Sequence, residues 1–71
     1  MQVQELGSFI KDRRNELRLT QPYIAELAGI SVNTLSKLER GQSNPSLEVL
    51  SKVTEVLGIQ IRLEIKKVGN Q

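Results

Sequence analysis

Apolar side chains near the start of the chain recur at the spacing of a helix. The positions of this stripe are Leu6, Phe9, Ile10, Arg13 and Leu17. Because successive members stand mostly three or four residues apart, their side chains fall on one face, and we predict a helix over residues 4–17. The stripe is the face of this helix that we expect to be apolar.

Three shorter helices are predicted next, with ranges 21–28, 32–40 and 46–57. Thr20 and Ser31 suit the N-caps of the first two, since a hydroxyl accepts a hydrogen bond from a first-turn N–H. Glycine follows each helix, at positions 29, 41 and 58, where it can take the left-handed conformation that closes the last turn. The side chains expected to face the interior are Ile24 and Leu27, and Leu47, Leu50, Val53 and Leu57 share one side of the last helix.

After Gly58 the period changes to that of a strand. Ile59, Ile61, Leu63 and Ile65 alternate with Gln60, Arg62, Glu64 and Lys66. We predict a strand over residues 59–67 with one apolar face, followed by a frayed tail, residues 68–71. A lone strand cannot satisfy its backbone groups in a helical chain, so we expect it to pair with the same strand of a second copy. The predicted organisation is thus an all-α domain over 1–58 and a dimerisation strand.

Composition narrows the possible functions. The 71 residues suffice for one small domain, and there is no cysteine and no histidine. Disulfides and the common zinc sites are thereby excluded, no cofactor is expected, and self-association is left as the aid to stability. No apolar run approaches the ~20 residues of a membrane span, so we expect a cytoplasmic protein with no membrane contact.

Charge adds a weaker indication. The net charge is +2 and the pI is about 9.3, and the basic residues gather near both ends of the chain. The two groups are Lys11, Arg13, Arg14 and Arg18 near the start, and Arg62, Lys66 and Lys67 near the end. A basic surface attracts phosphates and makes binding depend on salt, although each cluster alone is equally typical of a solvated charged face.

The most informative stretch is QPYIAELAGISVNTLSKLER, residues 21–40. Two short helices joined by a tight turn with Gly29 are the helix-turn-helix arrangement. Ala25 stands where the two helices cross, and a small side chain lets them approach. Ile30, Leu35 and Leu38 fill the angle between them and fix it. The second helix of this pair then projects so that its first residues can enter a major groove.

Four short motifs support this reading. They are T-Q at Thr20–Gln21, A-x-x-A-G at Ala25–Gly29, L-E-R-G at Leu38–Gly41 and N-P-S-L at Asn44–Leu47. With them, residues 10–58 resemble the Cro/repressor-type (XRE) helix-turn-helix family. The resemblance implies a lambda-repressor-like fold of four to five helices that binds double-stranded DNA. The added strand is similar to that of HipB-type antitoxins, which dimerise by pairing such strands and repress their own toxin–antitoxin operon.

Candidate DNA contacts follow from the helix-turn-helix arrangement. Asn33 suits adenine, Lys37 suits guanine O6 or N7, and Val32 suits a thymine methyl. Candidates for phosphate or flanking contacts are Gln21, Ser31, Thr34, Ser36, Arg40, Gln42, Ser43 and Asn44. The alternative for each is an ordinary solvated surface, and Arg40 could instead pair with an acidic neighbour.

The family resemblance also implies a structural ion pair. It places Arg14 of the first helix beside Glu39 near the end of the third, where the pair ties the recognition helix to the scaffold. Arg13 and Lys11 are then expected to be the more available to DNA.

The sequence bears on three possible functions. The leading prediction is a dimeric repressor whose recognition helices read an inverted repeat about one DNA turn, ~34 Å, apart. The second is an antitoxin whose main task is to neutralise a toxin protein. The third, an enzyme, is not expected, because the chain has no histidine or cysteine and no glycine-rich phosphate loop.

Overall fold

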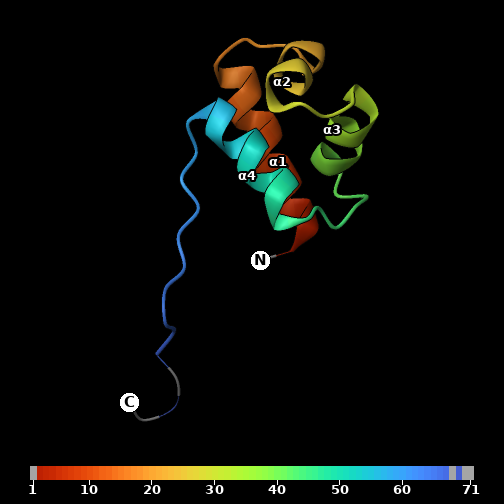
Figure 1. The fold of residues 1–71 in the computed structure, drawn as a ribbon. Coiled ribbons are helices and arrows are strands. Elements are labelled where there is room, and N and C mark those ends of the chain that lie inside the picture. The colour runs from red at the N-terminus through yellow and green to blue at the C-terminus, as the bar shows by residue number, and fades with distance from the viewer. Residues whose placement is uncertain (1, 68, 70–71) are drawn as a thin grey trace.

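Four helices follow one another in the computed structural model, which describes residues 2–67 and 69 (Figure 1). Their bounds are α1 Val3–Glu16, α2 Gln21–Ala28, α3 Val32–Glu39 and α4 Leu47–Leu57. The all-helical fold is as predicted, and each helix begins and ends within one residue of its predicted range. None of the described helices has the length and apolar character that a membrane crossing requires.

Capping residues set where the helices begin and end. The hydroxyls of Thr20, Ser31 and Ser46 accept the backbone N–H of the residue three positions later. Gly29 and Gly58 have φ near +70° and close α2 and α4 in the left-handed conformation, in which a Cβ is strained. Local chemistry therefore explains why helix boundaries could be predicted closely.

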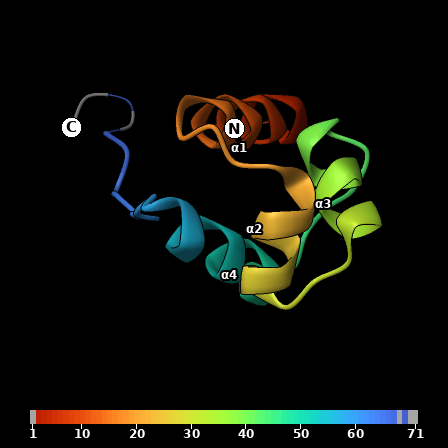
Figure 2. The same ribbon diagram turned by 90° about the horizontal axis from the view of Figure 1, so that it is seen from above.

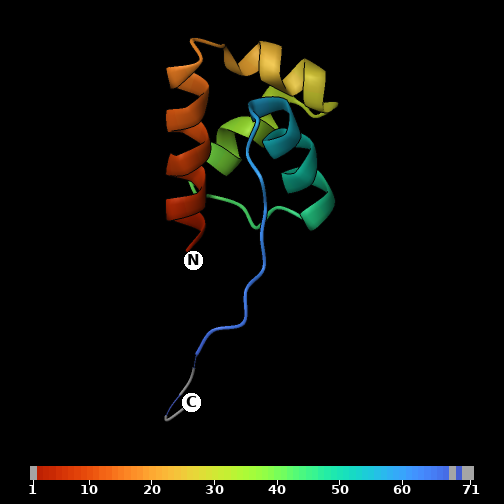
Figure 3. The same cartoon turned by 90° about the vertical axis from the view of Figure 1, so that its left-hand side faces the viewer.

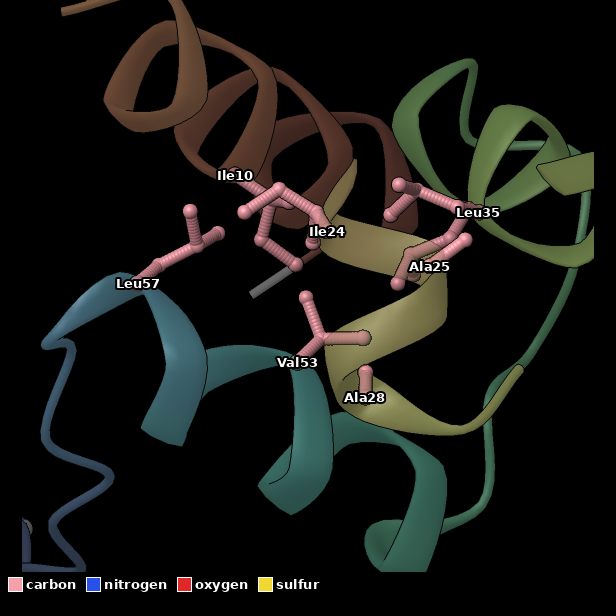
Figure 4. Packing of buried hydrophobic residues seen from close by; sticks show 8 residues of the cluster. Ile10, Ile24, Ala25, Ala28, Leu35, Val53 and Leu57 are labelled. Atoms are coloured by element: carbon pink, nitrogen blue, oxygen red, sulfur yellow. The ribbon is translucent and has the colours of Figure 1, made fainter. Parts of the chain in front are cut away.

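Side chains from all four helices meet in one apolar core. Its fully or nearly buried members are Ile10, Ile24, Ala25, Ala28, Leu35, Leu38, Val53 and Leu57 (Figure 4). Helices α1 and α4 stand beside one another, and α2 crosses one end of both (Figure 3). Ala25 is buried between its neighbours, as the close approach of α2 and α3 requires. The core thus fixes the orientation of α3 against the rest of the chain.

Four apolar residues that were predicted on the inner faces of helices are exposed instead. They are Phe9, Leu17, Leu27 and Leu47, which are 58%, 37%, 55% and 69% exposed. In α2 the inner face is occupied by Ile24, Ala25 and Ala28, so Leu27 points to one side. A periodic pattern identifies a helix, but only its neighbours decide how far the buried face extends.

The predicted strand over residues 59–67 is wrong for the single chain. These residues are extended but form no strand, while Ile59 packs against the core. Leu63 is 96% exposed and Ile65 is fully exposed. The physical reason is that a strand needs a partner for its backbone groups, and the rest of the described chain is helical. Of the predicted frayed tail, only Gly69 belongs to the described residues.

Candidate nucleic-acid interface

The outward face of α3 carries a stripe of polar side chains. Asn33, Ser36, Lys37 and Arg40 stand three or four positions apart, which places them on one side of the helix. The buried residues of α3 are on the opposite side. Asn33, Lys37 and Arg40 are exposed, and Ser36 is half-buried. The candidate base-reading and flanking residues therefore share a surface, and Val32 lies at its border, exposed.

The two ends of α3 add further polar groups to this surface. At the start, the Ser31 hydroxyl accepts the Thr34 N–H at 3.0 Å and lies 2.8 Å from the Thr34 hydroxyl. At the end, Arg40 Nε donates to the Ser36 carbonyl at 3.2 Å, so it meets the helix backbone. In the following loop Gln42 N–H donates to the Lys37 carbonyl at 2.9 Å.

The loop between α3 and α4 completes the set of candidate phosphate contacts. Gln42 and Asn44 are exposed, and Ser43 is half-buried. No three His, Cys, Asp or Glu side chains of residues 2–67 and 69 gather into a group that could hold a metal ion. The available chemistry is that of hydrogen bonds from amides, hydroxyls and cations.

A buried ion pair fastens the C-terminal end of α3. Arg14 Nε donates to Glu39 Oε2 at 2.7 Å, and its Nη2 donates to Oε1 at 2.8 Å. Arg14 Nη1 donates to the Leu19 carbonyl at 2.9 Å. The side chain of Glu39 is 1% exposed and that of Arg14 is 11% exposed. The structure therefore joins these two residues in a bidentate contact between α1 and α3.

Gln21, at the start of α2, belongs to the same network. Its Nε2 donates to Glu39 Oε1 at 3.0 Å. This contact was not predicted, because it joins residues 18 positions apart. The family resemblance implied only Arg14 as a partner of Glu39. The Glu39 carboxylate of α3 thus accepts hydrogen bonds from Arg14 of α1 and from Gln21 of α2, and so joins the three helices.

The network also sets the charge of Glu39. Burial by itself raises the pKa of this carboxyl, but hydrogen bonds from Arg14 and Gln21 and the charge of Arg14 outweigh it. The pKa of Glu39 therefore lies below its ordinary value. The hydrogen bond to Glu39 likewise raises the pKa of Arg14. Both groups remain charged near neutral pH.

Gly7 allows α1 to touch the end of α3 with its backbone. A Cβ built at this position would collide with the Leu38 carbonyl oxygen and stand 2.7 Å from that of Glu39. Any side chain here would push α3 away. Sequence reasoning missed this residue, although a glycine inside a helical pattern is a signal of close packing.

Contrary to the prediction, Arg13 is not available to DNA. Its Nε donates to the carbonyl of Leu57 at 2.9 Å, and its Nη1 pairs with Glu16. Leu57 is the last residue of α4, where unpaired carbonyls and the helix dipole attract a cation. Arg13 therefore joins α1 to α4, while Lys11 stays exposed.

These features are those of a helix-turn-helix DNA-binding protein: two short helices joined at a glycine, with the second anchored at one end and exposed along the other. Comparison with known proteins agrees, since a helix-turn-helix family model matches residues 10–63. The chain belongs to this family, in its XRE-type branch.

Relatives of the chain are regulators. It is 45% identical over 56 residues to the immunity repressor protein of Bacillus phage phi105, an alignment covering 79% of this chain and 39% of the relative. A 33% identical relative is an uncharacterised HTH-type transcriptional regulator of Mycobacterium tuberculosis, with 89% of this chain and 45% of the relative covered. The chain thus spans less than half the length of these two curated relatives.

A solved structure shares the fold over nearly the whole chain. A chain of the HipA-HipB-O2-O3 complex superposes with a TM-score of 0.83 at 25% identity, covering 94% of each chain. The restriction-modification controller protein C.AhdI of Aeromonas hydrophila gives a TM-score of 0.78 at 29% identity, covering 82% of this chain and 88% of that one.

Proposed function

We propose that this chain is a sequence-specific DNA-binding repressor that occupies an inverted-repeat operator as a homodimer. The observation that carries the proposal is the division of α3 into an anchored end and an exposed polar face. Leu38 and Glu39 are buried against the scaffold, while Asn33 and Lys37 are exposed. A short helix held in this way can present side chains to base edges in a major groove.

Each base-reading residue has a specific task in this proposal. The Asn33 amide offers a donor and an acceptor, which match adenine N7 and N6. The Lys37 ammonium donates to guanine O6 or N7, and Val32 contacts a thymine methyl. Asn33 and Lys37 stand four residues apart on one face, so they meet neighbouring base pairs rather than the same one.

The remaining polar groups hold the sugar-phosphate backbone. They are Gln21, Ser31, Thr34, Ser36, Arg40, Gln42, Ser43 and Asn44. Gln21 has a second role, because its amide donates to Glu39 and so couples the start of α2 to the anchor of α3. Phosphate contacts of this kind fix the orientation of the protein on the duplex and make its affinity fall with salt.

Repression follows from occupancy. Two copies place their α3 helices ~34 Å apart on one side of the duplex, and a promoter that overlaps the site is blocked. The relation to a phage immunity repressor supports this mode of action. We place the protein in the cytoplasm, where it has access to its operator.

Selection of bound duplexes from a random pool tests the proposal. The expected result is a two-fold symmetric sequence with half-site centres about 10 base pairs apart. Enrichment of a site with no symmetry would contradict the dimer, and failure to enrich any sequence at moderate salt would contradict the proposed function itself.

A second candidate is an antitoxin that neutralises a toxin by direct contact and represses its own operon. The likeness to a chain of the HipA-HipB-O2-O3 complex favours it. The two roles are compatible in one protein. The test is to express the chain together with the product of the adjacent reading frame. Relief of growth arrest and a stable complex support the antitoxin, and a harmless neighbour excludes it for that gene pair.

A further inference from the structure

The segment of residues 59–67, here called the tail segment, exposes an apolar face that its own chain leaves uncovered. Leu63 and Ile65 project into solvent, and Ile61 is exposed beside them. Ile59 donates its N–H to the Thr54 carbonyl, whereas residues 60–67 form no backbone hydrogen bond with the described residues. Unpaired backbone groups next to exposed apolar side chains mark an edge that another strand can complete.

A groove continues this apolar face onto the helices. It holds about 500 Å³ and is lined by Leu6 and Phe9 of α1, by Leu50 of α4 and by residues 59–63. The tail segment passes along the gap between α1 and α4 (Figure 3). It leaves the helices on the side away from α3 (Figure 2). A partner seated here leaves the candidate DNA-binding face open.

The order of charges in the tail segment identifies the partner and its register. In an antiparallel pair, directly opposite side chains point to the same face, so apolar residues oppose apolar residues. Registers centred on Arg62 or Glu64 set like charges directly against each other, which is destabilising. A register centred on residue 65 pairs Glu64 with the partner's Lys66, but it sets Leu63 against the partner's Lys67 and leaves Ile61 opposite Gly69. A register centred on Ile61 forms no cross-strand ion pair.

Among these registers, the one centred on Leu63 sets apolar residues opposite one another throughout residues 61–65 and also pairs opposite charges on the other face. Ile59 then opposes the partner's Lys67, but it packs against its own core. Ile61 then opposes the partner's Ile65, and Leu63 opposes its own copy. On the other face Arg62 opposes the partner's Glu64, and Glu64 opposes the partner's Arg62. Within one chain Arg62 Nη2 already lies 3.9 Å from Glu64 Oε1. The four side chains therefore form a square in which each charge has two opposite neighbours.

We propose that a second copy of this chain pairs antiparallel with the tail segment, with Leu63 on the two-fold axis and the Arg62–Glu64 square selecting the partner. This deepens the homodimer of the proposed function and rests on it. Ile61 lines the groove, so the partner's Ile65, which opposes Ile61, comes to lie beside the exposed ring of Phe9. The pairing thus covers the apolar groove as well as the strand edge.

Single cysteines test the register, because the chain has no native cysteine to interfere. Residues opposite each other in an antiparallel pair have Cα atoms about 4.5–5.5 Å apart, within reach of a disulfide. Mild oxidation of Leu63→Cys should therefore give a covalent dimer. Ile61→Cys is the matched control: two copies of residue 61 stand four residues apart along the strands, about 13 Å, and should not cross-link. An equal mixture of Ile61→Cys and Ile65→Cys should form the mixed dimer. Cross-linking of Ile61→Cys with itself, or none at Leu63→Cys, would overturn the register.

Charge reversals test the selection of the partner. Arg62→Glu and Glu64→Arg each turn two cross-strand attractions into repulsions, and each should weaken the homodimer about tenfold by sedimentation at low salt. Mixed together, the two variants regain opposite charges at both contacts and should form the mixed dimer in preference, which native mass spectrometry resolves. The double variant should dimerise with itself and reject the unmodified chain. The control is Glu48→Lys with Lys52→Glu, an exposed pair on α4 that should leave dimerisation unchanged.

The outcomes separate this inference from the proposed function. If every charge-reversal variant dimerises as tightly as the unmodified chain, the proposed role of the Arg62–Glu64 square is wrong, while the proposed DNA binding is unaffected. A chain that stays monomeric at all concentrations, with no cross-link at any cysteine, overturns both the pairing and the homodimer. Loss of operator binding with normal cross-linking overturns the proposed function alone.

Discussion

The two ends of α3 differ in nearly every physical respect. Its last two residues, Leu38 and Glu39, are buried, and the side chain of Glu39 is 1% exposed and held by Arg14 and Gln21. Its first three residues, 32–34, are exposed, and the Thr34 hydroxyl hydrogen-bonds only with the Ser31 cap. One end is thus bound by long-range contacts to two other helices, while the other is free for a ligand. A recognition helix needs both, because an unanchored helix could not hold base contacts in register.

This contrast gives a rule for mutation. Changes at the anchored end should lower the free energy of unfolding, and changes at the exposed end should alter binding without altering stability. The expected loss of stability is largest at the buried ion pair and smallest at the exposed end of α3.

Arg14→Met should have the largest effect. It leaves the Glu39 carboxylate buried with Gln21 as its remaining side-chain donor, and breaking a buried pair in this way costs about 3–5 kcal/mol. Denaturant unfolding measures the loss. Arg14→Lys, which keeps the charge but not the bidentate geometry, should lose less. Equal losses for both variants would contradict this, because they would show that a charge without the bidentate geometry contributes nothing.

Gly7→Ala should come next. The added methyl group meets the carbonyls of Leu38 and Glu39 at less than 3 Å, so α1 and α3 must separate. Overpacking of this kind costs about 1–3 kcal/mol. Ser8→Ala, at the exposed neighbouring position, is the control and should change little. If Gly7→Ala is as stable as the Ser8 variant, the close contact does not hold in solution.

Acid should weaken the anchored end through Glu39. The pKa of this carboxyl is lower in the folded chain than in the unfolded chain, so its stabilising contribution is complete above the unfolded value, about 4.3. The contribution is lost as the pH falls below that value and approaches the folded pKa. Unfolding free energy should therefore fall more steeply between pH 5 and about pH 3 than it does in Glu39→Gln. Parallel pH profiles would contradict this assignment.

Asn33→Ala should have the smallest effect on stability. Its side chain is exposed at the other end of α3, so the free energy of unfolding should stay within about 0.5 kcal/mol of the unmodified value. Thermal unfolding followed by circular dichroism measures this. A loss as large as that of Gly7→Ala would mean that the exposed end also supports the fold.

Features set by neighbours in sequence could be predicted well. The bounds of α2 follow from Thr20 and Gly29, because a cap and a left-handed glycine act within one turn. The family to which the chain belongs was likewise identified from short motifs in residues 20–47. In these cases the chemistry that decides the structure lies within a few residues.

Features set by distant contacts could not be predicted from the residues alone, and the Arg14–Glu39 pair was expected only because the family resemblance implied it. The bond from Gln21 to Glu39, the contact of Arg13 with the end of α4 and the exposure of Phe9 depend on how helices pack. The missing strand has a different cause. Its alternating pattern is present, but the partner that would complete it lies outside a single chain. The pattern predicts a capacity to pair, and the isolated chain shows the unpaired state.

The most direct test of the central claim is the ratio of affinities for the selected operator and a scrambled duplex at moderate salt. We expect Asn33→Ala and Lys37→Ala each to reduce this ratio by a factor that corresponds to about 1–3 kcal/mol of binding free energy. Binding of Asn33→Ala to the scrambled duplex should change little. Lys52→Ala, on the exposed surface of α4, should keep the full ratio. Undiminished discrimination in both α3 variants, with helix content intact, would contradict the assignment of α3 as the element that reads DNA.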